Sequence, residues 1–427
     1  MSWIVRPSIA VPYPKLSFEH ITSVAGSSTD ATDVECPLIT PSSPRGPQMP
    51  EPVVLDRVAF AWVAANGTKS WSFVEITDAN GETVTVECQG LRTVDDRERI
   101  FAEFIERLRG VQITGDEEVE RLLGLTREEG KANSRVVSAL ATAVVEFQCR
   151  YSGLSMTEAL GGKPKERQLL YANLNRYLRD VKKSRTPVDF GEAAEGAARE
   201  GFTILKTDPF DEVRPTHTVD EIFEVASVSL ERLAAMRSAA GDDVALQVDC
   251  HGAFNVETTI AIAPELERLG VTWFEDPVRH RDELEGLCTV VEQVTIPIAA
   301  GGDDYGEETF AELVQSGVKY TMQDVMRCGG VGVAARAGQA GARHGAQTSC
   351  HSPFGPLSNL ASAHVHAATP NPHALEHALW ENDWRADLID PPEIVEDGHL
   401  VFPGGVGMGA TVNWKTLESV GGVRWTP

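Results

Sequence analysis

The stretches VALQVDCHGAF (residues 244–254) and VTWFEDPV (residues 271–278) carry the strongest fold signal in this chain of 427 residues. Each is a short apolar run that leads into acidic residues, and a segment of helical pattern separates the two. Continuous apolar strands that alternate with helices are typical of a parallel sheet covered on both faces. The two stretches therefore predict neighbouring parallel strands of an α/β fold.

Six more runs of the same kind extend this pattern to eight strands within about 210 residues. They are LLYANLN (169–175), TILKTD (203–208), IPIAAGG (296–302), YTMQDV (320–325), AQTSCHS (346–352) and ALEHALW (374–380). Eight strand–helix units favour a closed barrel. A doubly wound sheet is the rival arrangement, but no GxGxxG pattern follows the first strand. We assign residues 166–384 to this barrel domain.

The segments on either side of the barrel differ from it in composition. Residues 53–90 alternate as strands with Asn-Gly turns and residues 94–165 look helical, so residues 53–165 predict an α+β unit: a three-stranded sheet, then helices. Residues 1–52 are interpreted as an irregular, proline-rich arm, which lies either on the surface or over an active site or partner subunit. Residues 385–427 are rich in glycine and are expected to pack on the α+β unit.

The excess of acidic residues restricts the partners that the chain can have. Asp and Glu number 63 against 38 Lys and Arg, which gives a formal net charge of −25. This charge disfavours nucleic acid and anionic membranes as partners, whereas an anionic small substrate stays open because a bound cation can invert the charge of one pocket. The chain has no run of ~18 apolar residues, so no membrane-spanning helix is expected. Seven cysteines without a CxxC pattern are expected to be reduced thiols in a cytoplasmic protein.

Ionisable residues stand at the ends of the predicted strands. From Asp249 onward they follow at intervals of 26, 28, 21, 27 and 25 residues, which is one strand–helix unit each time. The strand ends of a barrel converge on one mouth, where barrel enzymes place their chemistry. A single acid after a strand is more often a helix N-cap, but capping alone does not explain six such residues in register. The strand-end residues are Lys206, Asp208, Asp249, His251, Glu275, Asp303 or Asp304, Asp324, His351 and Glu376.

These residue types indicate metal-assisted proton abstraction. Asp249, Glu275 and a third acid would form an all-oxygen cage, which suits Mg²⁺ better than zinc. Such an ion could hold a substrate carboxylate and stabilise the negative charge that forms when the neighbouring C–H is removed. The spacing of Asp324 and His351 allows the acid to hold one imidazole nitrogen and to leave the other free as a base.

Taken together, these motifs resemble the enolase superfamily, in particular its mandelate racemase-like branch. The resemblance covers nearly the whole chain after residue 53 and rests on VDCHGAF, FEDPV, QDVMRCGGVG, CHSPFG and PHALEHALW. It implies an α+β capping domain that closes a modified (β/α)7β barrel, and a homo-oligomer. It also implies that Mg²⁺ stabilises an enediolate after abstraction of the proton alpha to a carboxylate, that Glu376 hydrogen-bonds the substrate carboxylate, either protonated or matched by a donor, and that Lys206 supplies a nearby positive charge.

Two motifs make the resemblance more specific. VDCHG is similar to the Asp-x-His pattern of dehydratases of acid sugars such as galactonate and mannonate, which implies that Asp249 binds the metal and that His251 is the general acid. LKTDPF carries Asp208 where racemases of the family have a second lysine as a base. This departure argues against racemisation by a Lys/His pair and favours elimination with one base and one acid.

A second departure concerns the metal. The family's fifth strand ends in Gly-Glu, whereas this chain has IPIAAGGDDYG, so that Gly302 occupies the ligand position. We assign Asp303 as the third ligand after a local shift, with Asp304 as the alternative. Among residues with weaker signals, Asp208, Asn175 and Arg327 are assigned to substrate binding.

The sequence thus predicts a hydro-lyase that dehydrates an aldonate-type sugar acid. His351, oriented by Asp324, would remove the alpha proton, and His251 would protonate the leaving hydroxyl, which gives a 2-keto-3-deoxy acid. Two alternatives stay open: a racemase or epimerase of a 2-hydroxy or related acid, and a metal-free, non-catalytic relative that uses the barrel as a binding scaffold.

Overall fold

The eight apolar runs form eight parallel strands of one sheet. A computed structural model describes residues 51–67, 69–91, 97–281 and 284–426, all of which belong to a single unit, Met49–Pro427. The predicted N-terminal arm therefore lies outside the described residues, apart from its last two. The parallel strands are β4 (Arg167–Asn173), β5 (Ile204–Thr207), β6 (Ala245–Asp249), β7 (Val271–Glu275), β8 (Ile298–Ala300), β9 (Tyr320–Thr321), β10 (Gln347–Thr348) and β11 (Leu375–Ala378).

The strand order follows the chain from β4 to β10, and β11 pairs with β4 on its other side. At the remaining edges, β10 and β11 form no ladder within the described residues, but the backbone N–H of His373 donates to the carbonyl oxygen of Thr348 at 2.8 Å. The hydroxyl of Ser349 also donates to the carbonyl of Ala374 at 2.7 Å. The fold is therefore mixed α/β, and its strand order is consistent with a barrel.

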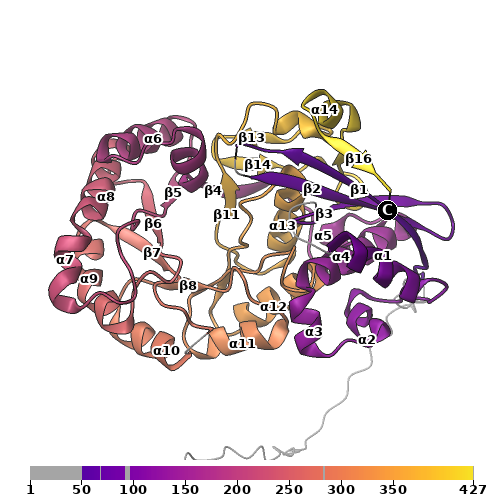
Figure 1. Cartoon of the computed structure of the whole chain (residues 1–427), viewed down its shortest axis with the longest axis horizontal. Helices are drawn as coiled ribbons and strands as arrows, with labels where there is room; N and C mark the ends of the chain where they lie inside the picture. Colours follow the sequence, from indigo (N-terminus) through magenta and orange to yellow (C-terminus); the bar gives the residue numbers. More distant parts are fainter. Residues whose placement is uncertain (1–50, 68, 92–96, 282–283, 427) are drawn as a thin grey trace, which may run out of the picture. The chain divides into compact units, whose positions relative to one another are not determined.

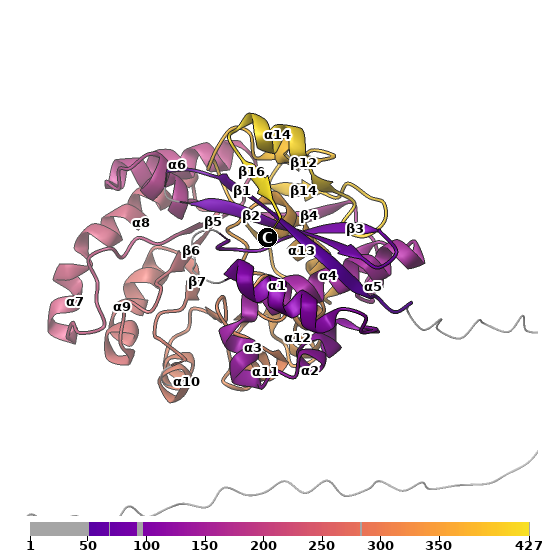
Figure 2. The same cartoon turned by 45° about the vertical axis from the view of Figure 1, so that its right-hand side comes forward.

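Helices lie outside these strands, as Figures 1 and 2 show for α6 to α12. Local signals start several of them: Thr186 caps α6 before a proline in its first turn, and the side chain of Asn255 caps α9 by accepting from the N–H of Thr258. The helices of this region are α6 (Pro187–Arg199), α7 (Val219–Val225), α8 (Ser227–Ala240), α9 (Val256–Arg268), α10 (Leu284–Gln293), α11 (Glu307–Gln315), α12 (Val331–Ala342) and α13 (Pro356–Ala368).

The N-terminal part forms a separate antiparallel sheet with the order β16-β1-β2-β3. The three strands that the sequence predicted from residues 53–90 are present as β1, β2 and β3. The sheet has a fourth strand because the C-terminal β16 pairs with β1, with Phe60 opposite Trp425. Its strands are β1 (Leu55–Ala64), β2 (Ser70–Asp78), β3 (Thr83–Glu87) and β16 (Val423–Trp425). The helices beside it are α1 (Arg97–Leu108), α2 (Val119–Leu123), α3 (Arg127–Ala132), α4 (Ser134–Ser152) and α5 (Met156–Ala159).

A single hydrophobic cluster joins the N-terminal sheet to the strands and helices of the second part. It contains Phe60 and Phe73 of the first sheet, Phe147 of α4, and Leu357 and Leu360 of α13. The hydrophobic core continues across residues 165 and 384 without a break. The domain boundaries predicted at these two positions therefore stay predictions. The remaining elements are β12 (Ile389–Asp390), β13 (Ile394–Glu396), β14 (His399–Val401), β15 (Thr411–Val412) and α14 (Trp414–Ser419).

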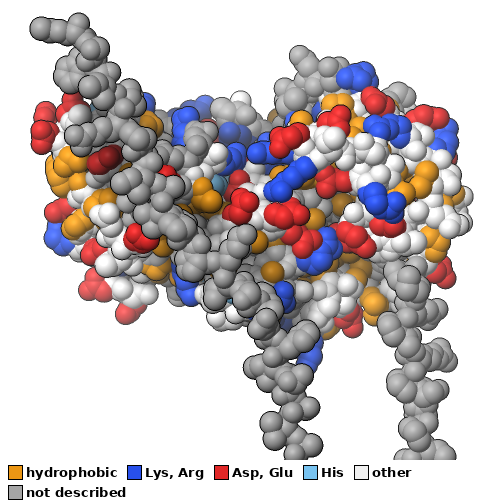
Figure 3. Space-filling view, turned by 90° about the horizontal axis from the view of Figure 1, so that it is seen from below, with side chains coloured by type: hydrophobic (Ala, Val, Ile, Leu, Met, Phe, Trp, Pro, Cys, Tyr) orange, Lys and Arg blue, Asp and Glu red, His pale blue; other side chains and the backbone are white. Residues whose placement is uncertain are grey.

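Acidic and basic side chains are intermingled on the face of the molecule that Figure 3 shows. Ion pairs such as Arg336 with Asp116 and Glu307 join side chains of opposite charge. Within the described ranges, none of the helices combines the length and the apolar character that crossing a membrane requires.

Candidate active site

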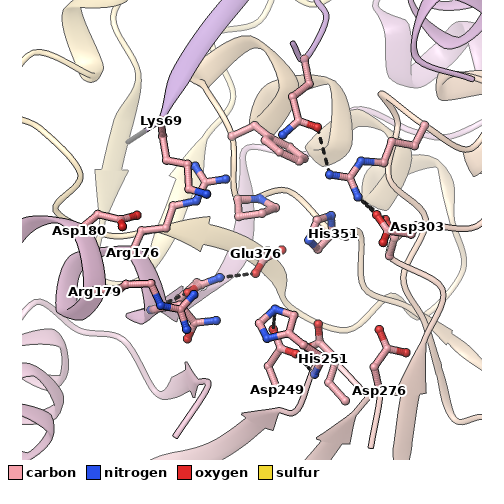
Figure 4. A pocket seen from close by; sticks show the side chains of 18 of the residues that line it. Lys69, Arg176, Arg179, Asp180, Asp249, His251, Asp276, Asp303, His351 and Glu376 are labelled. Carbon is pink, nitrogen blue, oxygen red and sulfur yellow. Dashed lines mark hydrogen bonds and ion pairs between the residues drawn. The ribbon is translucent and has the colours of Figure 1, made fainter. Parts of the chain in front are cut away.

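One cavity of about 430 Å³ lies at the carboxyl ends of the parallel strands. Most of its walls come from residues that end or follow β4, β6 and β7, follow β8, β9 and β10, or lie within β11. The N-terminal part contributes three side chains. Figure 4 shows Lys69, Arg176 and Arg179 on one side and His351 and Asp303 on the other. The lining residues are Lys69, Gln89, Arg135, Asn173, Asn175, Arg176, Arg179, Asp180, Asp249, His251, Glu275, Asp276, Gly302, Asp303, Arg327, His351, Pro353, Phe354 and Glu376.

A fully buried lysine, Lys206, lies among three carboxylates that line this cavity. The ammonium group of Lys206 donates to both oxygens of Glu275, at 3.1 and 2.9 Å, and lies 2.8 Å from Oε1 of Glu376 and 4.0 Å from Oδ2 of Asp249. Burial alone would lower the pKa of Lys206, but the charges of Glu275 and Glu376 raise it well above its ordinary value. The lysine therefore stays charged and balances the acids that the strand register brings together.

Glu376 accepts hydrogen bonds at both of its oxygens. Oε1 accepts from the side-chain amide of Asn173 at 2.6 Å and from Lys206, and Oε2 accepts from the backbone N–H of Ser352 at 2.8 Å. Burial would raise the pKa of Glu376, but the charge of Lys206 outweighs it and the net direction is downward. The contact of Glu376 with a substrate carboxylate stays a prediction, and three donors already surround Glu376 in the structure.

His351 and Asp324 form a hydrogen-bonded pair at one wall of the cavity. Nδ1 of His351 lies 3.1 Å from Oδ2 of Asp324, and the acid is fully buried. The backbone N–H of Met326 donates to Oδ1 of Asp324 at 2.9 Å and fixes that carboxylate in place. Nε2 of His351 is thus left as the nitrogen that can act on a molecule in the cavity.

His251 pairs with Asp249 at the end of β6. Its Nε2 lies 3.1 Å from Oδ2 of Asp249, and its backbone N–H donates to Oδ1 of the same residue at 3.2 Å. The residue has a positive φ of 51°, which is uncommon for a side chain larger than glycine. The negative charge of Asp249 raises the pKa of His251 to about 9, so the imidazole is protonated at neutral pH.

The expected third metal ligand has other partners. Asp303 is half exposed and forms ion pairs with Arg327 and, at 3.2 Å, with Arg281. Asp304 is buried and accepts from His280 at 2.8 Å and from Arg281 at 2.9 Å. Across the described residues, no group of three His, Cys, Asp or Glu side chains is arranged to hold a metal ion. Glu275 is paired with Lys206 and Asp249 with His251, so the expected cage of three carboxylates is not assembled here.

The residues assigned to substrate binding are divided between the cavity and its surroundings. Asn175 and Arg327 line the cavity, and Oδ1 of Asn175 is buried without a hydrogen bond among the described residues. Asp208 is buried outside the cavity lining and pairs with Arg179 and, at 3.1 Å, with Arg185.

Sequence reasoning missed the cavity residues of the N-terminal part. Lys69, Gln89 and Arg135 line the cavity, and none of them belongs to a motif with a chemical meaning. Lys69 directly precedes β2 and Gln89 lies two residues after the end of β3, so the available signal for these two residues was their position next to strand ends.

Comparison with known proteins yields matches over most of the chain. The profile of the family described as "Enolase C-terminal domain-like" matches residues 189–416. The D-gluconate dehydratase of Thermoproteus tenax is 29% identical over 289 residues, which cover 67% of this chain and 56% of that protein. The D-xylonate dehydratase of Haloferax volcanii is 24% identical over 318 residues, which cover 70% of this chain and 73% of that protein. Such sugar acid dehydratases are hydro-lyases.

Solved structures match the fold. The mandelate racemase/muconate lactonizing enzyme from Jannaschia sp. CCS1 superposes with a TM-score of 0.77 at 24% identity, over 87% of this chain and 98% of that one. A member of the enolase superfamily from Salmonella Typhimurium gives a TM-score of 0.73 at 18% identity, over 86% of this chain and 99% of that one.

Proposed function

The chain belongs to the family of enolase C-terminal domain-like proteins, and on that premise we propose that it is a hydro-lyase that dehydrates a sugar acid. Family membership confirms the resemblance inferred from the motifs. The matching part of the chain spans only 56% of the Thermoproteus relative. The activity and the substrate are therefore proposals, supported by the cavity residues and by these relatives. The observation that carries the proposal is the presence of two carboxylate–histidine pairs, Asp324–His351 and Asp249–His251, on one cavity.

The two histidines have the properties that a β-elimination needs. His351 would accept the proton alpha to the substrate carboxylate on Nε2, while Asp324 holds its other nitrogen. The C–H electron pair forms the new double bond as the C–O bond to the beta hydroxyl breaks. That hydroxyl takes a proton from His251 and leaves as water. The resulting enol loses its hydroxyl proton and gains one proton at its beta carbon to give the 2-keto-3-deoxy acid, so atoms and charge balance.

Cationic side chains support an anionic, hydroxylated substrate. Lys69, Arg135, Arg176 and Arg179 line the cavity, where they could bind hydroxyl and carboxylate oxygens of a substrate. Asn175 offers a buried carbonyl oxygen that lacks a partner among the described residues and could accept from a substrate hydroxyl. These groups favour a polyhydroxylated acid over an apolar one.

Enolase superfamily members generally use Mg²⁺, and we extend that expectation to this chain. Asp249 and Glu275, opposite each other in strand register, would supply two ligands, and such an ion would offset negative charge on the substrate. The third ligand would be Asp303, which must first leave Arg281 and Arg327. Glu275 would likewise have to give up at least one of its contacts with Lys206. The proton transfers described above are assigned to protein side chains alone.

We also propose the wider architecture on the same basis: an α+β capping domain (53–165), a modified (β/α)7β barrel (166–384) and a C-terminal segment (385–427) packed on the capping domain. The strand order and the contact between His373 and Thr348 support closure of the barrel.

The first prediction tests the reaction. Incubation of the protein with Mg²⁺ and a panel of aldonic and aldaric acids should give a 2-keto-3-deoxy acid from at least one aldonic acid, because one base and one protonated acid face the same cavity. Keto-acid formation is measured with a carbonyl reagent, and deuterated solvent reports alpha-hydrogen exchange in the recovered substrate. Exchange with inversion of the centre and no loss of water would support the racemase alternative, for which a second base opposite His351 would be required.

The second prediction tests the metal. Saturating Mg²⁺ should raise the Tm by about 2–4 °C, because an ion that binds only the folded state stabilises it. Asp249→Asn, Glu275→Gln and Asp303→Asn should each remove this shift, whereas Asp304→Asn should retain it because Asp304 is committed to His280 and Arg281. A wild-type Tm that does not respond to Mg²⁺ or to chelation would favour the metal-free binding scaffold.

A further inference from the structure

The segment that leaves β3, from Glu87 to Gln89, connects the N-terminal sheet to the loop that carries His351. Glu87 is 7% exposed, and its carboxylate accepts the backbone N–H of Gly355 at 2.8 Å and that of Ser358 at 3.0 Å. These N–H groups belong to the start of α13, whose N-cap residue is Gly355 and has no side chain that could cap. The N-terminal part therefore supplies the cap of this helix from another sheet.

The loop between β10 and α13 contains His351 and is held at several points. The N–H of Ser352 donates to Glu376, and the carbonyl oxygen of Phe354 accepts from Arg385. The ring of Phe354 packs edge-on to the imidazole of His351, with centroids 5.5 Å apart. The residue after Phe354 is the one that Glu87 holds, so a shift of Gly355 would displace Phe354, whose ring packs on the imidazole of His351.

Gln89, two residues further along the same segment, is linked through Arg327 to Asp324, the residue that pairs with His351. Its Oε1 accepts from Nη2 of Arg327 at 3.0 Å and from Nε of Arg135 at 3.3 Å. Nε of Arg327 lies 3.1 Å from Oδ2 of Asp324, which is the oxygen that also contacts His351. Gln89 thus helps to hold the arginine that shares the carboxylate of Asp324 with the base.

We propose that Glu87 and Gln89 are positioning residues that set the orientation of the Asp324–His351 pair, Glu87 through the start of α13 and Gln89 through Arg327. This inference rests on the proposed function, in which His351 is the base. It makes the N-terminal sheet part of the proton-abstracting apparatus. Lys69 and Arg135 of the N-terminal part also line the cavity. Packing of the N-terminal part on the parallel strands would therefore determine both its contacts with substrate and the alignment of His351.

The third prediction uses the variants Glu87→Gln and Gln89→Leu. Each should lower kcat by about 10- to 100-fold with a KM within about threefold of wild type, because misplacement of a catalytic group by ~1 Å costs about that factor. Gln89→Glu retains an acceptor oxygen for Arg327 and should keep kcat within about threefold of wild type. Glu82→Gln and Gln112→Leu make the same chemical changes at exposed positions of the N-terminal part and should match wild type.

Hydrogen–deuterium exchange gives a readout that does not depend on activity. In Glu87→Gln, one of the two N–H groups of Gly355 and Ser358 faces an amide NH₂ instead of an acceptor, so a peptide covering 350–358 should exchange faster than in Glu82→Gln. Unchanged kcat in both Glu87→Gln and Gln89→Leu, measured in an active wild-type background, would overturn the inference. A loss of kcat in Gln89→Leu that Gln89→Glu does not restore would also overturn it for Gln89. If Glu87→Gln does not fold, the Gln89 variants test the inference by themselves. A wild-type protein that dehydrates no acid would refute the proposed function and not this inference.

Discussion

His351→Asn is expected to lower kcat/KM for dehydration by about 10³-fold and to abolish exchange of the alpha hydrogen with deuterated solvent. Asparagine can still contact Asp324, but it has no nitrogen that takes up a proton near neutral pH. The pair is buried at Asp324 and open to the cavity at His351, so its geometry directs the free imidazole nitrogen toward the substrate. Mass spectrometry of the recovered substrate and an assay of keto acid measure the two steps separately.

His251→Asn is expected to separate these steps. The variant should still exchange the alpha hydrogen, because His351 is intact, but it should form keto acid at least about 10²-fold more slowly because the hydroxyl leaves without its proton donor. The side chain of His251 is 62% exposed, so its removal should change the Tm little. Near-normal dehydration by His251→Asn would show that another group donates the proton. His399→Asn is the control, at a half-buried histidine that begins β14 and does not line the cavity.

Lys206→Met is expected to destabilise the protein by about 3–5 kcal/mol, the usual cost of breaking a buried ion pair from one side. Methionine fills a similar volume but leaves the carboxylates of Glu275 and Glu376 buried without the cation that both contact. Urea unfolding followed by fluorescence gives the free-energy difference. Lys163→Met, at an exposed position, is the matched control, and Lys206→Met combined with Glu275→Gln should recover part of the loss.

The stability that Lys206 contributes should decrease as the pH falls. Lys206 holds the pKa of Glu376 below its ordinary value of 4.5, and a carboxyl with a depressed folded-state pKa adds stability above its unfolded pKa that is lost as the pH falls. Wild type should therefore lose more stability than Lys206→Met when the pH is lowered through this range. A variant as stable as wild type at pH 7 would contradict the view that the lysine balances the buried acids.

The strand ends could be predicted because two short-range regularities determine them. An apolar run marks a buried strand, and the strand–helix repeat places the following polar residue at a common edge of the sheet. For that reason Asp249, Glu275 and Glu376 were found from spacing alone, and the structure brings them around Lys206. The family followed from the same motifs.

The partner of each strand-end residue could not be predicted in the same way. Asp303 was chosen as a ligand because it follows Gly302, but Arg281 and Arg327 from neighbouring loops pair with it. Asp208 was assigned to the substrate, yet Arg179 and Arg185 contact it. Charged side chains pair according to which loops meet in space, and the sequence periodicity carries no information about that.

The chain's local patterns thus determined the strands, their ends and the kind of chemistry that those ends favour. Only the tertiary structure decided that β16 completes the first sheet, that Glu87 caps α13, and that Gln89 and Arg135 reach the cavity. The physical reason is the range of the interactions. Strand and helix patterns arise from neighbours within one turn or one pleat, whereas these contacts join residues hundreds of positions apart, and only packing of the common hydrophobic core brings them together.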